Sequence, residues 1–147
     1  MLQKSTREKV LEIFFLEPSK KHYLKEISKK IKIAHTSVKK VLNELLEEKI
    51  IIEKIERKGK RNFPLFYSNL EIDNFKNLKK FNNFKEIYDS KLIEYLEEKF
   101  MPKSIVLFGS YFRGEDIEES DIDLFIEVEE LEVYLKKFEK KLGRKIN

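Results

Sequence analysis

Apolar residues recur at helical spacing in three segments near the start of the chain. The first segment follows the capping candidates Ser5 and Thr6 and ends before Pro18. The second surrounds Ile27. The third, residues 34–49, is the most regular, because its apolar residues stand at i, i+3, i+4, i+7 and i+8: Val38, Val41, Leu42, Leu45 and Leu46. This pattern predicts three helices.

A β-hairpin is predicted directly after the third helix. The runs "IIIEKIER" and "FPLFYSNL" are rich in β-branched and aromatic residues, and they flank the turn "KGKRN" around Gly59. Pro64 cannot donate to a strand ladder, so we expect it at a sheet edge or a strand start. The first 70 residues therefore predict three helices followed by a hairpin.

The second half predicts a helical segment and then a mixed α/β region. Residues 71–100 carry an apolar or aromatic residue about every third or fourth position, with Asp89 and Ser90 as a break between two helices. A strand at 104–108, a loop at 109–120, a strand at 121–128, a helix at 131–142 and a strand start at 144–147 follow. We predict an α+β chain with a domain at 1–70, a helical connector at 71–100 and a domain at 101–147, which is incomplete if the native chain continues.

Charge separates the two halves and narrows the chemistry. Residues 1–70 contain 17 Lys+Arg and 9 Asp+Glu, whereas residues 71–147 contain 14 and 18. The first half thus favours a polyanion and the second favours cations. The absence of Cys and the presence of only two His exclude thiolate sites and His clusters, so a bound metal needs oxygen ligands. The sequence shows no transmembrane run and no apolar signal core, and we expect a cytoplasmic protein.

The first half resembles winged helix-turn-helix domains such as those of MarR-like and ArsR-like repressors, over roughly residues 5–69. In that arrangement the start of the third helix enters the major groove of duplex DNA, and the hairpin turn contacts phosphates. The resemblance implies a DNA-binding surface of exposed polar and basic residues on both elements: Thr36, Ser37, Lys39, Lys40, Asn43, Arg57, Lys58, Lys60 and Arg61. Lys20 and Lys21 could add phosphate contacts, and His35 is better explained as a capping or surface residue. A protein-interaction role for the module stays open as an alternative.

The second half places two carboxylates on one side of a strand. Alternate residues of a strand share a face, so Ile122 and Leu124 point into a core while Asp121 and Asp123 point to the other side. Such a pair can hold Mg²⁺, which prefers oxygen ligands and fills its remaining positions with water or phosphate. The preceding strand ends in "GS", where Gly109 permits a sharp turn next to a ligand.

The joint pattern "SIVLFGSYFRGEDIEESDIDLFIEV" resembles the signature of the DNA polymerase β-like nucleotidyltransferase superfamily, most closely its minimal branch. The resemblance implies that Gly109, Ser110 and Arg113 hold the phosphates of a nucleoside triphosphate. It also implies that Asp121 and Asp123 are the catalytic carboxylates and hold Mg²⁺ for transfer of a nucleotidyl group to an acceptor. Some minimal members are antitoxins that add AMP to a HEPN-type toxin, so a protein partner or substrate is compatible with the resemblance.

One departure from the family pattern concerns a third carboxylate. The family carries it in an apolar-Asp pair on a later strand, where this chain has Ile146 and Asn147. An amide oxygen can bind a metal but cannot act as a general base. Either the domain continues beyond Asn147 or the third carboxylate is missing. We therefore expect a DNA-associated nucleotidyltransferase, with a non-catalytic DNA-binding transcriptional regulator as the alternative and a homodimer as an open option.

Overall fold

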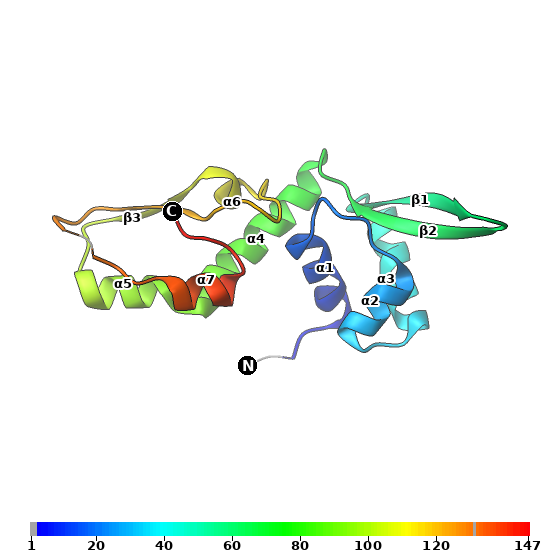
Figure 1. Cartoon of the computed structure of the whole chain (residues 1–147), viewed down its shortest axis with the longest axis horizontal. Helices are drawn as coiled ribbons and strands as arrows, with labels where there is room; N and C mark the ends of the chain where they lie inside the picture. Colours follow the sequence, from blue (N-terminus) through cyan, green and yellow to red (C-terminus); the bar gives the residue numbers. More distant parts are fainter. Residues whose placement is uncertain (1–2, 131) are drawn as a thin grey trace. The chain divides into compact units, whose positions relative to one another are not determined.

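The computed structural model describes residues 3–130 and 132–147, and it confirms the predicted α+β fold (Figure 1). The chain forms two compact units, Met1–Phe75 and Lys76–Asn147. In the described part of the chain, no helix is both long and apolar enough to cross a bilayer. The domain limits predicted above, 1–70, 71–100 and 101–147, stay a prediction.

The first unit begins with three helices, α1 (Thr6–Leu16), α2 (Leu24–Ile31) and α3 (His35–Glu47). Helix α1 starts with a capping box: the Glu8 N–H donates to Ser5 Oγ at 3.2 Å, and the Ser5 N–H donates to Glu8 Oε2 at 2.7 Å. The apolar faces of the helices supply the core, whose fully buried members include Phe14, Leu42 and Leu45. Of the five apolar positions predicted in the third helix, four are buried, Val38, Val41, Leu42 and Leu45, and Leu46 is half-buried.

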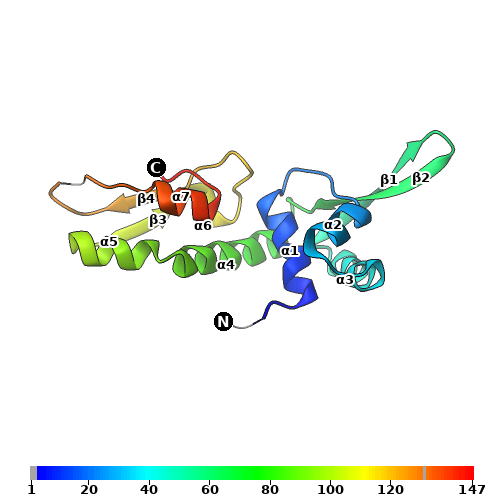
Figure 2. The ribbon, with the colours of Figure 1, turned by 60° about the horizontal axis from the view of Figure 1, so that its bottom comes forward.

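The hairpin of strands β1 (Ile51–Lys58) and β2 (Arg61–Ser68) extends away from these helices (Figure 2). On its other side, β2 meets the segment between α1 and α2, where His22 and Phe66 exchange backbone hydrogen bonds of 2.9 and 2.8 Å. Pro64 stands opposite Ile55 in a two-stranded sheet, so its strand is an edge strand as expected. Three helices, this short bridge and the hairpin form a winged helix-turn-helix.

Among its described residues, the second unit combines four helices and a small sheet. Its elements are α4 (Asp73–Ser90), which begins in the first unit, α5 (Leu92–Phe100), β3 (Ile105–Phe108), α6 (Gly109–Arg113), β4 (Asp123–Ile126) and α7 (Lys136–Leu142). The break between two helices predicted at Asp89 and Ser90 is present one residue later, at Lys91, whose backbone is left-handed with a φ of 64°. The core is built from residues of α4, α5, α6, α7 and the sheet: Ile87, Leu92, Leu96, Tyr111, Ile122, Phe138 and Leu142.

Strands β3 and β4 pair antiparallel, with Val106 opposite Phe125 and Phe108 opposite Asp123. On the other edge of β4, Ile122 and Ile146 form a parallel bridge, so residues 144–147 start a third strand as predicted. Alternate residues Ile105, Leu107, Leu124 and Ile126 pack against the core. In Figures 1 and 2, α5 runs along one side of this sheet.

Two predicted elements are shorter than expected. The predicted helix at 131–142 is wrong in its first half, because α7 begins only at Lys136; Leu131 lies outside the described residues. Val133 and Leu135 instead pack against the core from a non-helical segment, so core contact outweighs their helical spacing. The strand predicted at 121–128 is reduced to Asp123–Ile126, with Ile122 contributing the bridge.

Replacing Gly114 with alanine should destabilise the second unit. A Cβ at Gly114, where φ is 70°, would overlap the Lys76 carbonyl oxygen of α4, whereas a Cβ at Gly143, with φ of 65°, meets nothing within 4 Å. Gly143→Ala should therefore cost only left-handed strain, about 1–2 kcal/mol. Gly114→Ala should cost about 1–3 kcal/mol more. Urea unfolding of both variants tests the difference, and equal destabilisation would contradict the close packing of α6 on α4.

Candidate active site

The turn from β3 into α6 brings Gly109 directly against Asp123. The backbone of Gly109 has a φ of 77°, and a Cβ at this position would overlap the Asp123 carboxylate. The antiparallel register causes this approach, because it places Phe108 opposite Asp123 at the end of the hairpin. Any other residue at position 109 would push the carboxylate away from the turn.

Asp121 and Asp123 flank the fully buried Ile122 and point away from the core, as predicted. Asp121 is exposed and Asp123 is half-buried. Asn147 lies beside them: its N–H donates to the Ile122 carbonyl at 2.9 Å, and its side-chain Nδ2 donates to Asp123 Oδ1 at 3.3 Å. Asn147, where the resemblance leads us to expect a third carboxylate, thus contacts Asp123 as an amide.

The donor set of this site suits a hard divalent cation. No group of three or more His, Cys, Asp or Glu that could hold a metal occurs among residues 3–130 and 132–147. Asp121 and Asp123 nevertheless offer carboxylate oxygens. The absence of a side chain at Gly109 lets the Asp123 carboxylate lie against the turn, and Asn147 Nδ2 donates to its Oδ1. Mg²⁺ is compatible with few protein oxygens, because it retains waters or binds phosphate oxygens.

The other two predicted phosphate ligands, Ser110 and Arg113, lie at opposite ends of α6. Ser110 lies in the first turn of α6 and is half-buried, next to Gly109. Arg113 is exposed at the end of α6, where its Nε donates to Glu115 Oε2 at 2.8 Å. This contact with Arg113 lowers the pKa of the Glu115 carboxyl. The structure therefore brings Gly109, Ser110 and Asp123 together, whereas Arg113 is paired with an acid two residues further along.

A surface groove of about 780 Å³ adjoins Asp121, and no pattern in the sequence indicates it. The groove runs between the loop before β4 and helix α7. Its basic side chains come mostly from α7 and the segment after it: Lys136, Lys140, Arg144 and Lys145. A volume of this order is typical of sites for small molecules. Glu118, Glu119 and Glu139 also line the groove, so both cations and acids lie beside the candidate catalytic carboxylate of Asp121.

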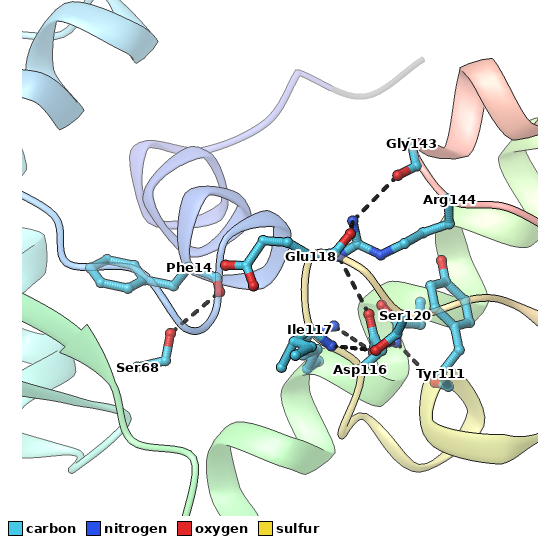
Figure 3. Close-up of polar contacts among 11 residues, drawn as sticks. Phe14, Ser68, Tyr111, Asp116, Ile117, Glu118, Ser120, Gly143 and Arg144 are labelled. Atoms are coloured by element: carbon cyan, nitrogen blue, oxygen red, sulfur yellow. Dashed lines mark hydrogen bonds and ion pairs between the residues drawn. The ribbon is translucent and has the colours of Figure 1, made fainter.

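A buried cluster of charges holds the loop that precedes β4. Lys79 of α4 and Asp116 are each 1% exposed, and Lys79 Nζ lies 2.5 Å from Asp116 Oδ1. Asn83 Nδ2 donates to the same carboxylate oxygen at 2.8 Å and to the Tyr111 carbonyl at 2.9 Å. Figure 3 shows the Arg144 side chain directed toward Asp116, whose Oδ2 lies 3.6 Å from a guanidinium nitrogen. The cluster ties α4, α6, the loop and the C-terminal segment together.

Two pKa shifts accompany this burial. Desolvation lowers the pKa of the Lys79 ammonium, against the opposing attraction of Asp116. Burial, together with the negative charge of Asp116, raises the pKa of the Tyr111 phenol, which therefore stays neutral. The sequence offered no signal for this cluster, because Lys79 is one of many lysines on a helix and its burial follows from tertiary packing.

The predicted DNA-contacting residues lie on two exposed surfaces of the winged helix. In α3, the side chains of Thr36, Ser37, Lys39, Lys40 and Asn43 are exposed, as are Arg57, Lys58, Lys60 and Arg61 around the hairpin turn. Lys20 and Lys21 are instead ion-paired with Glu17 and Glu56. Lys58 Nζ donates to the Tyr23 hydroxyl at 3.3 Å, and this bond raises the pKa of Lys58.

Residues 89–146 match the Nucleotidyltransferase domain family. The "Putative protein adenylyltransferase MJ1215" of Methanocaldococcus jannaschii is 47% identical over 62 residues, which make up 42% of this chain and 71% of that protein. The chain therefore belongs, through this part, to the nucleotidyltransferase domain family.

Other relatives match over shorter stretches. The "Putative protein adenylyltransferase MJ0128" of the same organism is 54% identical over 44 residues, 30% of this chain and 45% of that protein. The "Protein adenylyltransferase MntA" of Thermococcus cleftensis is 46% identical over 41 residues, 28% of this chain and 41% of that protein. The chain spans about half the length of the first relatives that it matches. A solved structure titled "Possible transcriptional regulator from Methanosarcina mazei Go1" is 19% identical with a TM-score of 0.44, and the match covers 66% of this chain and 79% of that one.

Removing the carboxylate of Asp116 should lower the free energy of unfolding far more than removing a carboxylate from an exposed ion pair. Asp116→Ala leaves Lys79 and Arg144 buried without their counter-charge, which should cost about 3–5 kcal/mol. The control is Asp89→Ala, because Lys85 and Asp89 form an exposed pair at 2.7 Å and such pairs contribute about 0.3–0.5 kcal/mol. Thermal or urea unfolding measures both, and a similar destabilisation in the two variants would contradict the structural role of Asp116.

Proposed function

We propose that the protein is a Mg²⁺-dependent nucleotidyltransferase whose winged helix binds double-stranded DNA, and that a polypeptide is its acceptor. The close approach of Asp123 to Gly109, on a chain that belongs to the nucleotidyltransferase domain family, carries the proposal. In this proposal residues 1–70 bind DNA and residues 101–147 bind the nucleoside triphosphate, according to the predicted domain limits.

In this proposal the chain's own groups position the reactants. The turn at Gly109 and the Ser110 hydroxyl bind the terminal phosphates, while Asp121 and Asp123 hold Mg²⁺. The ion supplies charge neutralisation at the phosphates when it is bound. Arg113 contributes only after it exchanges Glu115 for a phosphate. Lys140 and Lys145, which line the groove beside Asp121, add positive charge for the triphosphate or the leaving pyrophosphate.

The proposal of a protein acceptor rests on the names of the relatives, which are described as protein adenylyltransferases. By the same analogy the transferred group is AMP and the nucleotide is ATP. The DNA-binding role rests on the exposed basic residues of α3 and the hairpin turn. A cytoplasmic location and a homodimer remain predictions that fit a DNA-binding module.

Asn147 favours a second candidate, a DNA-binding regulator with a degenerate nucleotidyltransferase domain. Its amide stands beside Asp123, at the position where the family has its third carboxylate. An amide can neither accept the proton of an acceptor hydroxyl nor add negative charge for a metal. A protein of this second kind would bind a nucleotide without transferring it.

Nucleotidyl transfer should depend on Asp121 and Asp123 and increase when the third carboxylate is restored. With labelled ATP, Mg²⁺ and acceptor polypeptides, Asp121→Asn and Asp123→Asn should each reduce labelling at least a hundredfold, because the metal loses a charged ligand. Asn147→Asp should raise it, since the amide is replaced by a carboxylate of the same shape. Equilibrium dialysis of ATP on the same variants is the control. ATP binding without any transfer, including by Asn147→Asp, would contradict the enzyme and favour the regulator.

Duplex DNA binding should weaken when the charges of the hairpin turn are removed. Replacing Lys58, Lys60 and Arg61 with alanine should lower the affinity at low salt and reduce the slope of log K against log[salt] by about one unit for each phosphate that the hairpin no longer neutralises. The charge-matched control replaces Lys85, Lys99 and Lys103 in the second unit. Anisotropy titrations of a labelled duplex at several salt concentrations measure both, and equal effects of the two triple variants would contradict a specific role for the hairpin.

A further inference from the structure

The sheet face that carries the candidate catalytic carboxylates is not covered by the described part of the chain. Leu124 and Ile126 pack into the core, so their neighbours point to the opposite side. We call this side the carboxylate face, and it consists of Ser104, Val106, Phe108, Asp121, Asp123, Phe125 and Glu127. The register pairs Phe108 with Asp123 and Val106 with Phe125 across the two strands. Beyond them, Ser104 Oγ donates to Glu127 Oε2 at 3.1 Å.

Three apolar side chains on this face are open to solvent beside the carboxylates. Val106 is 47% exposed, Phe108 48% and Phe125 55%. Isolated exposed apolar residues are ordinary, but here two of the three form a cross-strand pair next to a charged site. An acceptor that reaches Asp123 along this face from the Glu127 end would pass the Val106–Phe125 pair and then Phe108.

The charges of the face disfavour a nucleic acid in this place. Past the apolar pair stands the exposed carboxylate of Glu127, and nearer the site are Asp121 and Asp123. Aromatic side chains can stack on the bases of single strands, but such sites follow the phosphate backbone with cations. Here the side chain that follows Phe125 on the face is an acid. Lys145, which lines the groove beside Asp121, lies at the other end.

We propose that the carboxylate face binds an extended segment of the acceptor polypeptide, with apolar contacts at Val106 and Phe125 and a basic residue at Glu127. The inference rests on the proposed function and deepens it, because it specifies which sequences around the acceptor hydroxyl are recognised. Asp123 and Phe125 are alternate residues of β4, and Glu127 lies just beyond the strand, where its N–H donates to the Ser104 carbonyl at 3.0 Å. At the rise of an extended chain, Phe125 and Glu127 lie about 7 and 13 Å from Asp123. An extended acceptor carries matching groups at the same period: a hydroxyl residue, an apolar residue two positions away and Lys or Arg four positions away on the same side.

Peptide selection tests this surface without requiring catalysis. The probes are nine-residue peptides with Ser, Thr or Tyr at one end and all remaining positions varied. Fluorescence anisotropy measures their binding in the presence of Mg²⁺. We expect selection of an apolar residue at the second position from the hydroxyl residue and of Lys or Arg at the fourth. Glu127→Lys should reverse the charge selected at the fourth position to Asp or Glu. This reversal cannot result from a general loss of structure.

A matched pair of phenylalanine variants tests the apolar contact. Phe125→Ser should weaken the best peptide about tenfold, whereas Phe81→Ser, at a phenylalanine of α4 that is 72% exposed, should leave its affinity unchanged. The absence of positional selection, an unchanged preference in Glu127→Lys, or equal effects of both serine variants would overturn the proposal. So would tighter binding of an oligo-dT of equal length. A change in sedimentation of the free protein caused by Phe125→Ser would also overturn it, because a second copy would then cover the face.

The outcomes of these binding experiments are separate from those of the transfer assay. Peptide selection that follows the predicted pattern in a protein unable to transfer a nucleotidyl group would contradict the proposed enzyme and retain the docking surface. Transfer to peptides without this pattern would retain the proposed enzyme and contradict the docking surface.

Discussion

The position of the candidate active site depends on one buried carboxylate. Asp116 lies between α6 and β4 and compensates the charges of Lys79 and Arg144, all in a region that is almost closed to water. Burying such charges is favourable only when each has its partner, so the loop has few alternatives to its observed path. Because Arg144 also begins the segment that ends at Asn147, the same carboxylate influences what stands beside Asp123.

Two glycines transmit this arrangement to the site. Gly114 lies against the backbone of α4 and lets α6 approach the helix closely, and Gly109 leaves room for the Asp123 carboxylate at the opposite end of the same short helix. Close contacts within the fold therefore require glycine at both positions.

The two faces of the small sheet differ in burial and in composition. One face completes the core with Leu107, Leu124 and Ile126, and the other presents two aspartates beside exposed apolar side chains. The winged helix of the first unit has its own exposed basic surface on α3 and the hairpin turn. In the proposed function the first unit recognises a polyanion and the second unit acts on a phosphate. The chain forms two compact units, Met1–Phe75 and Lys76–Asn147.

Local patterns determined the helices, the hairpin and the alternation of Asp121, Ile122 and Asp123, because helix and strand periods are properties of neighbouring residues. The family signature likewise located the turn at Gly109 from adjacent letters. Periodicity failed at residues 132–135, where Val133 and Leu135 contact the core from a non-helical segment. Only the tertiary structure decided that Lys79 is buried against Asp116, that Asn147 meets Asp123 and that Phe125 stays exposed. Each of these depends on contacts between residues far apart in the chain, for which a single sequence carries no local signal.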